Sequence, residues 1–272
     1  MPELPEVQTV VDGIRPYLEG KVLAAIKLKV KKLRYEIPRS IKKDSLTQQI
    51  TKVIRKAKYI LIYLVNGKII VIHLGMTGKL LLDPPEITKH DHVIFEFLDG
   101  SSMAFNDVRK FGMLDLIDEE HMDDYKYFAK LGLEPLDKEF SNQAFIELVK
   151  NRSKSIKSVI MDANLLVGVG NIYANEALFK SGIHPEAIAQ DIDKTKIKLL
   201  RKNIITTLKE AIKAGGSTLK DFAKQDGSSG YFQHNFQVYG RAGEPCFKCK
   251  TKIERIRQNG RSSFLCPSCQ AC

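Results

Sequence analysis

Residues 50–75 read ITKVIRKAKYILIYLVNGKIIVIHLG, two runs rich in Val, Ile and Tyr on either side of Asn66-Gly67. β-branched and aromatic residues favour strands, and Asn-Gly is the dipeptide that two-residue hairpin turns prefer. The stretch therefore predicts strands over 50–65 and 68–75. Similar runs predict further strands over 22–30, 92–98, 102–106 and 112–117, with a second hairpin turn at Asp99-Gly100.

Helical periodicity lies on both sides of this strand-rich region. Apolar residues recur at helical spacing from Val7 to Leu18, Pro5 suits a first turn, and Gly20 ends the run. An antiparallel sheet region with such a helix predicts an α+β fold whose N-terminal part is a β-sandwich with flanking helices. After about residue 120 we expect helices over 141–152, 155–162, 171–181 and 191–214, the last one closed by Gly215-Gly216.

The change of texture predicts the domain boundaries. The stretch Leu131-Gly-Leu-Glu-Pro-Leu136 is typical of a linker between the two halves. We expect a β-sandwich domain at 1–130, a linker at 131–140, a helical domain at 141–236 and a cysteine-bearing tail at 237–272.

The charge balance indicates a polyanionic partner. There are 43 basic against 32 acidic residues, a net charge of +11 and a pI near 9.3. Nucleic acid is the first candidate and an anionic membrane the second, beside the simpler interpretation of a basic soluble protein. The N-terminus lacks the pattern of a secretory signal, and no run reaches the roughly 18 apolar residues of a membrane span. We therefore expect a cytoplasmic protein.

All five cysteines fall in the last 27 residues. Cys246 and Cys249 form one C-x2-C pair, and Cys266 and Cys269 form another 16 residues further on. This spacing predicts one structural zinc ion held by four thiolates, with a hairpin between the pairs. Metal binding of about 10–16 kcal/mol would largely hold so small a module folded. Cys272 is a possible competing ligand but is better interpreted as a spare thiol. The excess of basic residues between the pairs suggests either a DNA contact or a solvated surface.

The N-terminus offers a nucleophile. A small residue after Met1 normally permits methionine removal, which would leave the secondary amine of Pro2 beside Glu3 and Glu6. An α-amino group titrates near about 7.7–8.0, so part of it is neutral at cellular pH. Its attack on the anomeric carbon of a sugar gives a cationic iminium that draws electrons during elimination of phosphates, and Glu3 is close enough in sequence to move protons. Taken alone, the same residues would equally fit an incidental terminus.

Ordered motifs over nearly the whole chain resemble the bacterial formamidopyrimidine-DNA glycosylase family (Fpg, or MutM). They comprise the opening MPELPEVQTV and Arg55-Lys-Ala-Lys-Tyr59, His73-Leu-Gly-Met76, Lys89-His-Asp-His92, Asp107-Val-Arg-Lys-Phe-Gly112, Val167-Gly-Val-Gly-Asn-Ile-Tyr-Ala-Asn-Glu176, Gly182-Ile-His-Pro185, Gly215-Gly-Ser-Thr-Leu-Lys-Asp-Phe222, Val238-Tyr-Gly-Arg241 and the zinc tail. The resemblance implies a helix–two-turns–helix motif in the helical domain and a zinc-binding β-hairpin. It also implies a monomeric bacterial enzyme that acts on double-stranded DNA containing damaged bases or abasic sites.

The activity implied is that of a bifunctional glycosylase and lyase. Such an enzyme removes 8-oxoguanine and formamidopyrimidines and then cuts the strand by β,δ-elimination. By resemblance, Pro2 is the Schiff-base nucleophile and Glu3 the proton donor. Lys58 matches the essential lysine near the scissile phosphate, although its strand-like surroundings also fit a solvated lysine. Arg261 matches the arginine of the δ-elimination step.

The resemblance further implies DNA contacts. An enzyme cannot reach a stacked nucleotide, so it must flip the nucleotide out and fill the gap. Met76, Arg109 and Phe111 match the residues that fill this gap, although Met76 and Phe111 would also fit a core. A glycine-rich turn before a helix is a good phosphate cradle. The remaining expected contacts are His90, Arg152 and the phosphate-binding Asn171, and residues 217–230 resemble the lesion-capping loop.

Two departures and three alternatives remain open. Lys110 stands where the family usually has a second arginine, and Val108 where proline or alanine is common. Lysine keeps the charge but loses bidentate geometry. The nearest alternative is the endonuclease VIII type, which prefers oxidised pyrimidines, although Leu4 stands where that type has glycine. The others are a non-catalytic DNA-binding protein of the same fold and a zinc-ribbon adaptor.

Overall fold

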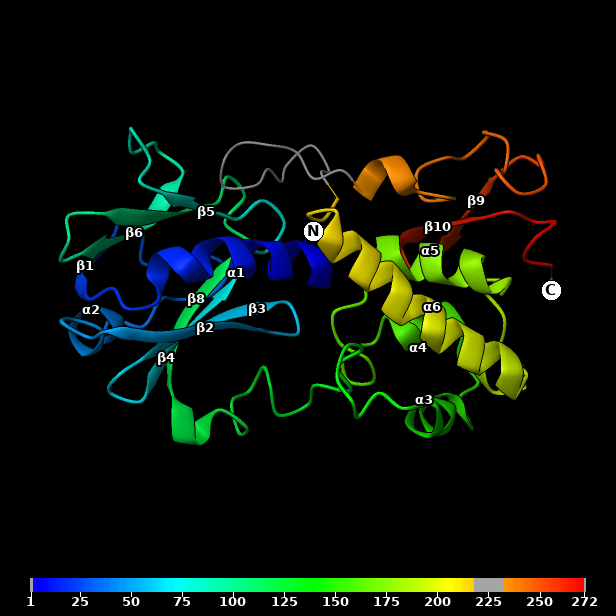
Figure 1. The fold of residues 1–272 in the computed structure, drawn as a ribbon, viewed down its shortest axis with the longest axis horizontal. Helices are drawn as coiled ribbons and strands as arrows, with labels where there is room; N and C mark the ends of the chain where they lie inside the picture. The colour runs from blue at the N-terminus through cyan, green and yellow to red at the C-terminus, as the bar shows by residue number, and fades with distance from the viewer. Residues whose placement is uncertain (1, 218–231, 272) are drawn as a thin grey trace. The chain divides into compact units, whose positions relative to one another are not determined.

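The computed structural model describes residues 2–217 and 232–271, which divide into two compact units (Figure 1). The first unit contains residues 2–129 and 214–217. The second contains residues 130–213 and 232–271. The predicted lesion-capping loop lies outside the described residues, apart from Ser217 at its start.

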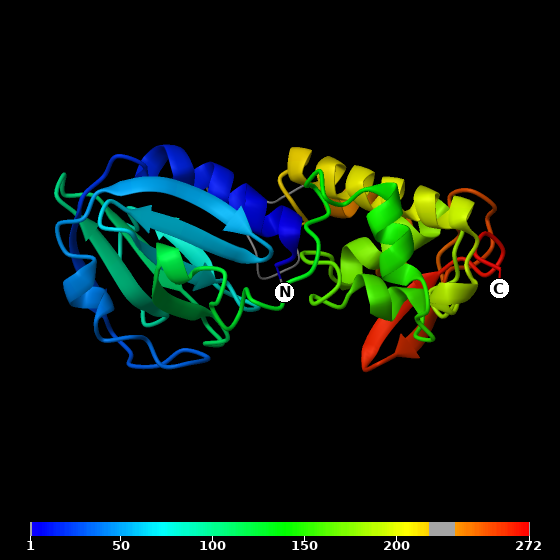
Figure 2. The same ribbon diagram turned by 90° about the horizontal axis from the view of Figure 1, so that it is seen from below.

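Two four-stranded antiparallel sheets form the first unit, in the orders β1-β6-β7-β5 and β2-β3-β4-β8 (Figure 2). One apolar core takes side chains from both, for example Ile60 and Ile70 from one sheet and Phe95 and Phe105 from the other. The predicted β-sandwich is therefore confirmed. The strands are β1 (Leu23–Leu28), β2 (Ile50–Lys56), β3 (Tyr59–Leu64), β4 (Lys68–His73), β5 (Lys79–Leu82), β6 (Asp91–Phe97), β7 (Ser102–Asn106) and β8 (Met113–Asp118).

Helix α1 (Leu4–Leu18) packs along the sandwich and contributes its apolar face to the same core (Figures 1 and 2). Val11 and Ile14 are fully buried there, as the helical spacing predicts. Pro5 lies in the first turn, where a missing N–H costs no hydrogen bond. The short helices α2 (Ile41–Asp44) and η1 (Glu119–His121) complete the unit.

The prediction of one strand over 50–65 is wrong. The chain turns at Ala57-Lys58, and β2 and β3 pair with each other across this turn. Ala57 adopts a left-handed φ of 53°. Such turns favour Gly or Asn, so a turn made of alanine and lysine carries no sequence signal. The turn at Asn66-Gly67 is as predicted, whereas the four-residue strand β5 was too short to be predicted.

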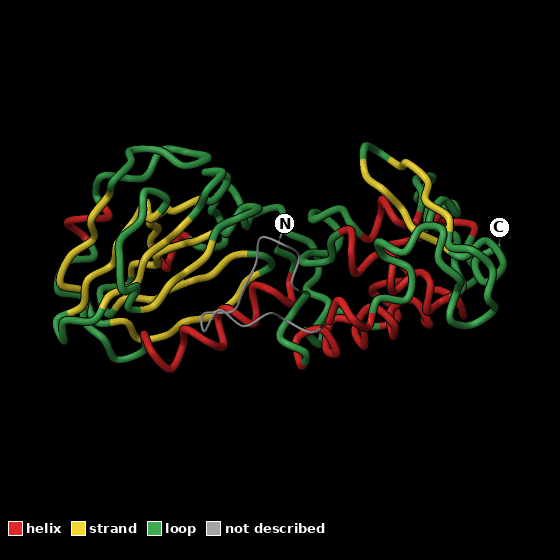
Figure 3. The backbone as a smooth tube through the Cα atoms, turned by 90° about the horizontal axis from the view of Figure 1, so that it is seen from above, coloured by secondary structure: helices red, strands yellow, loops and turns green. Residues whose placement is uncertain are grey.

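The second unit is helical with one β-hairpin, as predicted (Figure 3). Helix α5 packs against α4, α6 and strand β10. Helix α6 begins at Lys194 rather than at 191, because the Asp193 carboxylate accepts the N–H of Thr195 at 2.7 Å and so caps the first turn. Its elements are α3 (Asn142–Val149), α4 (Ile156–Ile160), α5 (Asn171–Ser181), η2 (Ala189–Asp191), α6 (Lys194–Lys213), η3 (Phe232–Asn235), β9 (Glu254–Gln258) and β10 (Arg261–Leu265).

Among residues 2–217 and 232–271, every helix is too short or too polar to cross a bilayer.

The close approach of Gly75 to the segment that contains Phe111 yields a stability prediction. Gly75 has a φ of +64°, and a Cβ there would lie 2.4 Å from the main-chain carbon of Phe111. Gly100 has a φ of +85° but nothing within 4 Å of such a Cβ. Gly100→Ala should lower the free energy of unfolding by only about 1 kcal/mol, from backbone strain. Gly75→Ala should lower it by roughly 3 kcal/mol or more, because the main chain must also shift.

Urea unfolding of both variants provides the measurement. Equal losses of stability for the two substitutions would show that the contact between Gly75 and the Phe111 segment is not tightly packed.

Candidate functional site

The N-terminal turn of α1 presents Pro2 and Glu3, both buried. Glu3 is the N-cap residue, and its side chain accepts the main-chain N–H of Glu6. Glu6 returns the contact, because its Oε2 accepts the main-chain N–H of Glu3 at 2.9 Å. These reciprocal contacts form a capping box in which Glu3 occupies the position that Ser or Thr usually takes. The box fixes the main chain next to the Pro2 nitrogen and places two carboxylates at the positive end of the helix.

Glu6 also binds the segment that follows α6. Its Oε1 accepts both the N–H and the hydroxyl of Ser217, each at 2.9 Å. Gly216, with a φ of +76°, permits this approach, since a Cβ there would lie 3.3 Å from the Glu6 side chain. From the sequence, only the proximity of Glu6 to Pro2 could be predicted. Glutamate is not the usual N-cap residue of a capping box, so the local sequence indicates neither that box nor the contact with Ser217.

Lys58 lies in the turn between β2 and β3, close to His73 at the end of β4. Burial lowers the pKa of His73 to about 4, and the positive charges of Lys58 and Arg34 add to the effect. The His73 Nδ1 accepts the N–H of Gly75 at 3.0 Å, so the neutral ring carries its proton on Nε2. The structure therefore brings Lys58 together with a neutral imidazole that the sequence analysis gave no role.

Two turns in the first unit, a largely buried one after β4 and an exposed one after β7, carry the residues expected to fill a gap in DNA. Arg109 lies with its guanidinium carbon 4.7 Å from the centre of the Phe111 ring, and 43% of Phe111 is exposed. Met76, half-buried, belongs to the turn after β4 that packs on the Phe111 main chain through Gly75. The structure thus groups the three residues on neighbouring turns. His90 is half-buried and lies in the loop that precedes β6.

In the second unit, Asn171 opens helix α5, as the glycine-rich motif predicts. Its Nδ2 donates to the carbonyl of Ser262 at 3.0 Å, and its buried Oδ1 accepts no hydrogen bond from the described residues. Lys157 is buried and donates to the same carbonyl at 3.2 Å. These contacts attach the β9–β10 hairpin to α4 and α5. Lys157 was not predicted as a site residue, because its position inside the short helix α4 gives no local signal.

Arg261 begins β10 and is exposed. It lines a small cavity of about 150 Å³ together with Lys157 and Gln258. Arg152 is also exposed, and its Nε donates to the Leu148 carbonyl at 2.7 Å near the end of α3. The described contacts link Arg261 to Asn171 through the hairpin but bring Arg152 to neither of them.

Glu176 organises the segment that precedes the zinc module. It is buried, and its carboxylate accepts the main-chain N–H groups of Gln237, Val238 and Tyr239 at 2.9, 3.0 and 2.9 Å. Burial raises the pKa of Glu176 above the usual carboxyl range, and the three N–H donors oppose this effect. The residue ends the motif at 167–176, but the sequence gives no reason to expect its three donors.

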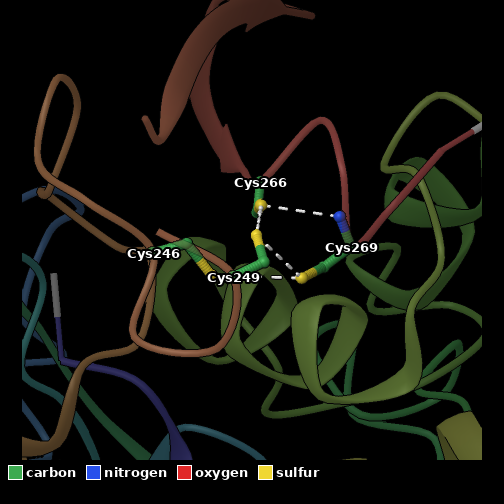
Figure 4. Close-up of side chains that lie close together, drawn as sticks. All are labelled: Cys246, Cys249, Cys266 and Cys269. Atoms are coloured by element: carbon green, nitrogen blue, oxygen red, sulfur yellow. Dashed lines mark hydrogen bonds between the residues drawn. The ribbon is translucent and has the colours of Figure 1, made fainter. Parts of the chain in front are cut away.

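The four predicted zinc ligands cluster in the second unit (Figure 4). Their sulfur atoms all lie within 4.8 Å of one another, with Cys249 Sγ 3.4 Å from Cys266 Sγ. A tetrahedron with Zn–S bonds of about 2.3 Å has S···S edges of about 3.8 Å, so the cluster fits one zinc ion. A tight turn holds the first pair, since the Lys250 N–H donates to the Cys246 carbonyl at 3.0 Å. Cys272 lies outside the described residues.

The predicted site residues are divided between the two units. The first unit holds Pro2, Glu3, Lys58, Met76, His90, Arg109 and Phe111, and the second holds Arg152, Asn171, Arg261 and the four cysteines.

Known relatives match this chain along its whole length. A formamidopyrimidine-DNA glycosylase of Ruegeria pomeroyi is 42% identical over 282 residues, covering 99% of this chain and 100% of that protein. A point mutant of Lactococcus lactis Fpg, crystallised with Fapy-dG-containing DNA, superposes with a TM-score of 0.92 at 33% identity over 100% of both chains. Lactococcus lactis Fpg in complex with abasic-site DNA gives a TM-score of 0.91 at 33% identity, covering 99% of this chain and 100% of that one.

Three family profiles account for most of the sequence. The formamidopyrimidine-DNA glycosylase N-terminal domain matches residues 1–114, the H2TH domain of the same family matches 131–223, and the zinc finger found in FPG and IleRS matches 243–271. The predicted family, fold class and structural zinc are confirmed by these matches and by the four-cysteine cluster. The chain belongs to the formamidopyrimidine-DNA glycosylase family.

Proposed function

We propose that this protein is a DNA glycosylase and AP lyase that removes oxidised purines, namely 8-oxoguanine and formamidopyrimidines, from double-stranded DNA. The observation that carries the proposal is the capping box of Glu3 and Glu6, which fixes the main chain beside the Pro2 nitrogen in a chain of this family. Fpg relatives bound to Fapy-dG DNA and to abasic-site DNA support the choice of substrate.

Pro2 is the nucleophile in this proposal. After removal of Met1, its nitrogen attacks the anomeric carbon of the damaged nucleotide, and the bond between sugar and base breaks. Opening of the sugar ring leaves an iminium linkage, and Glu3 supplies the proton that the ring oxygen takes up. The cation then draws electrons from the sugar, so that loss of a C2′ proton expels the 3′ phosphate and a second elimination expels the 5′ phosphate.

The cationic residues have separate roles in the proposal. Lys58 contacts the phosphate next to the lesion, and the neutral His73 beside it adds a hydrogen-bond donor without a second positive charge. Asn171 and the N-terminus of α5 bind backbone phosphate through N–H groups. Arg261 assists the second elimination, while His90 and Arg152 make further phosphate contacts.

The cellular context and the domain roles follow from the same proposal. We propose that the protein acts as a monomer on nucleoid DNA in the bacterial cytoplasm. Residues 1–130 form the catalytic domain, 131–140 the linker, 141–236 the helical domain with the lesion-capping loop, and 237–272 the zinc finger.

One experiment distinguishes the rival functions from the proposed one. An endonuclease VIII type would act faster on thymine glycol than on 8-oxoguanine, and a DNA-binding protein without catalysis would form no covalent adduct. The adaptor interpretation explains only the zinc tail, whereas family matches cover both units.

Borohydride trapping tests the nucleophile. Protein that has lost Met1 should form a covalent adduct with 8-oxoguanine duplexes, and more rapidly than with thymine glycol duplexes. Protein with Met1 retained should bind the same DNA but trap only at background level, because its Pro2 nitrogen is part of an amide. The N-terminal mass of each sample is measured in parallel. Failure of the processed, zinc-loaded protein to trap would overturn the enzymatic proposal.

The low pKa of His73 predicts a pH dependence of stability. Its folded pKa of about 4 lies below the unfolded value of about 6.5, so only the unfolded state takes up a proton between these values. The free energy of unfolding should therefore fall as the pH drops from about 6.5 to 4, by at most about 1.4 kcal/mol per pH unit from this residue.

His73→Gln removes this contribution and serves as the control. Its stability should fall less steeply over that interval in urea unfolding, and the wild-type imidazole should titrate near pH 4 by NMR. A wild-type imidazole midpoint near the ordinary histidine value would contradict the burial of the ring.

Loss of a zinc ligand should reduce the order of the second unit. Cys249→Ser should reduce zinc content from one ion per chain and weaken DNA binding, because a module with so small a core depends on about 10–16 kcal/mol of metal binding. Cys272→Ser is the matched control and should keep one zinc and normal affinity. Metal analysis and fluorescence anisotropy give the two measurements. Loss of zinc from Cys272→Ser would assign the terminal thiol to the site instead.

A further inference from the structure

One buried carboxylate joins the turn after β4 to the exposed turn after β7 in the first unit. Asp107 follows β7 and is fully buried. Its Oδ1 accepts the hydroxyl of Thr77 at 2.6 Å, and its Oδ2 accepts the N–H of Gly112 at 2.7 Å. Thr77 belongs to the turn that carries Met76, and Gly112 ends the turn that carries Arg109 and Phe111. The same carboxylate therefore bonds to both turns.

The main chain of Arg109 is held at the same place. Its N–H lies 3.2 Å from Thr77 Oγ1 and 3.3 Å from Asp107 Oδ1. Asp107 itself is fixed to the neighbouring strand β6, because its carbonyl oxygen lies 2.9 Å from His92 Nε2. His92 is 3% exposed and therefore lies in the interior of the unit.

The two turns also touch directly. Gly75 leaves no room for a side chain against the main chain of Phe111. Lys110 adopts a left-handed φ of 55°, a main-chain conformation that residues other than glycine rarely adopt. The surrounding contacts must hold it there. Arg109 and Phe111, on either side of Lys110, bring the guanidinium carbon and the ring centre within 4.7 Å of each other.

We propose that Thr77 and Asp107 are positioning residues that hold the two turns rigidly together. They thereby fix the DNA wedge, defined as Met76, Arg109 and Phe111. The proposal rests on the proposed function, in which these side chains fill the gap left by a flipped nucleotide. Stacked base pairs resist being parted, and a wedge on two independent loops would yield before the stack does. A fully satisfied buried polar network gives the stiffness that surface loops lack.

Thr77→Val tests the positioning role of Thr77, because it keeps the shape of the side chain and removes the hydroxyl. Single-turnover cleavage of an 8-oxoguanine duplex should slow about tenfold or more, as expected for a lost hydrogen bond to a charged group. Cleavage of a single-stranded oligonucleotide with an abasic site should stay within about twofold of wild type, since there is no stack to part. Thr77→Ser restores the hydroxyl and should restore the duplex rate.

Thr207→Val is the matched control, because the buried hydroxyl of Thr207 has no partner among the described residues. It should leave both rates unchanged. Equal slowing of Thr77→Val on both substrates, or no slowing on the duplex, would overturn the proposal. Thr77→Ala provides a second test of the lost hydroxyl should the valine variant fold poorly.

A readout that needs no chemistry separates this inference from the proposed function. 2-Aminopurine placed beside the lesion brightens when it is unstacked, and Thr77→Val should slow that brightening relative to wild type. Slow brightening would support the positioning role of Thr77 even if no cleavage occurred, whereas an unchanged rate of brightening would reject that role.

Discussion

The carboxylate of Glu6 is the contact on which the N-terminal arrangement depends. It is 3% exposed, and among the described residues its two oxygens accept one hydrogen bond from Glu3 and two from Ser217. Leaving a buried donor without its acceptor costs about 1–3 kcal/mol, so the three donors stabilise one arrangement strongly. The first turn of α1 is thereby joined to a residue 211 positions away in the chain. The place of the Pro2 nitrogen depends on both segments.

The same device recurs at two other places in the molecule. Asp107 gathers donors from the two turns of the first unit, and Glu176 gathers three consecutive N–H groups ahead of the zinc module. Each of these carboxylates is buried and bound mainly to main-chain donors. Loops have little apolar area with which to fix themselves, and charge-assisted hydrogen bonds substitute for a core. Irregular segments are thereby held firmly without becoming helices or strands.

Local patterns predicted the parts of this structure that depend on local chemistry. The turn at Asn66-Gly67, the apolar face of α1 and the paired cysteines were all predictable, because a backbone preference, a helical period or a ligand spacing specifies each. The turn at Ala57-Lys58 was not, since alanine and lysine carry no turn preference.

The candidate site shows the same division. The resemblance supplied residues by motif, and the structure groups Met76 with Phe111 and Lys58 with His73. Ser217, which donates to Glu6, and the three donors to Glu176 come from segments more than sixty positions away. No periodicity or spacing specifies such a contact, because it depends on how whole elements pack.

The apolar tip of the turn after β7 has a consequence for the free protein. Val108 is 57% exposed and Phe111 43% exposed, so hydrocarbon faces water at a prominent position. Exposed apolar patches favour self-association and aggregation. The net charge of +11 opposes this tendency, because copies of the chain repel one another in solution. The excess positive charge that attracts a polyanion thus also keeps copies of the protein apart while this apolar turn is exposed to water.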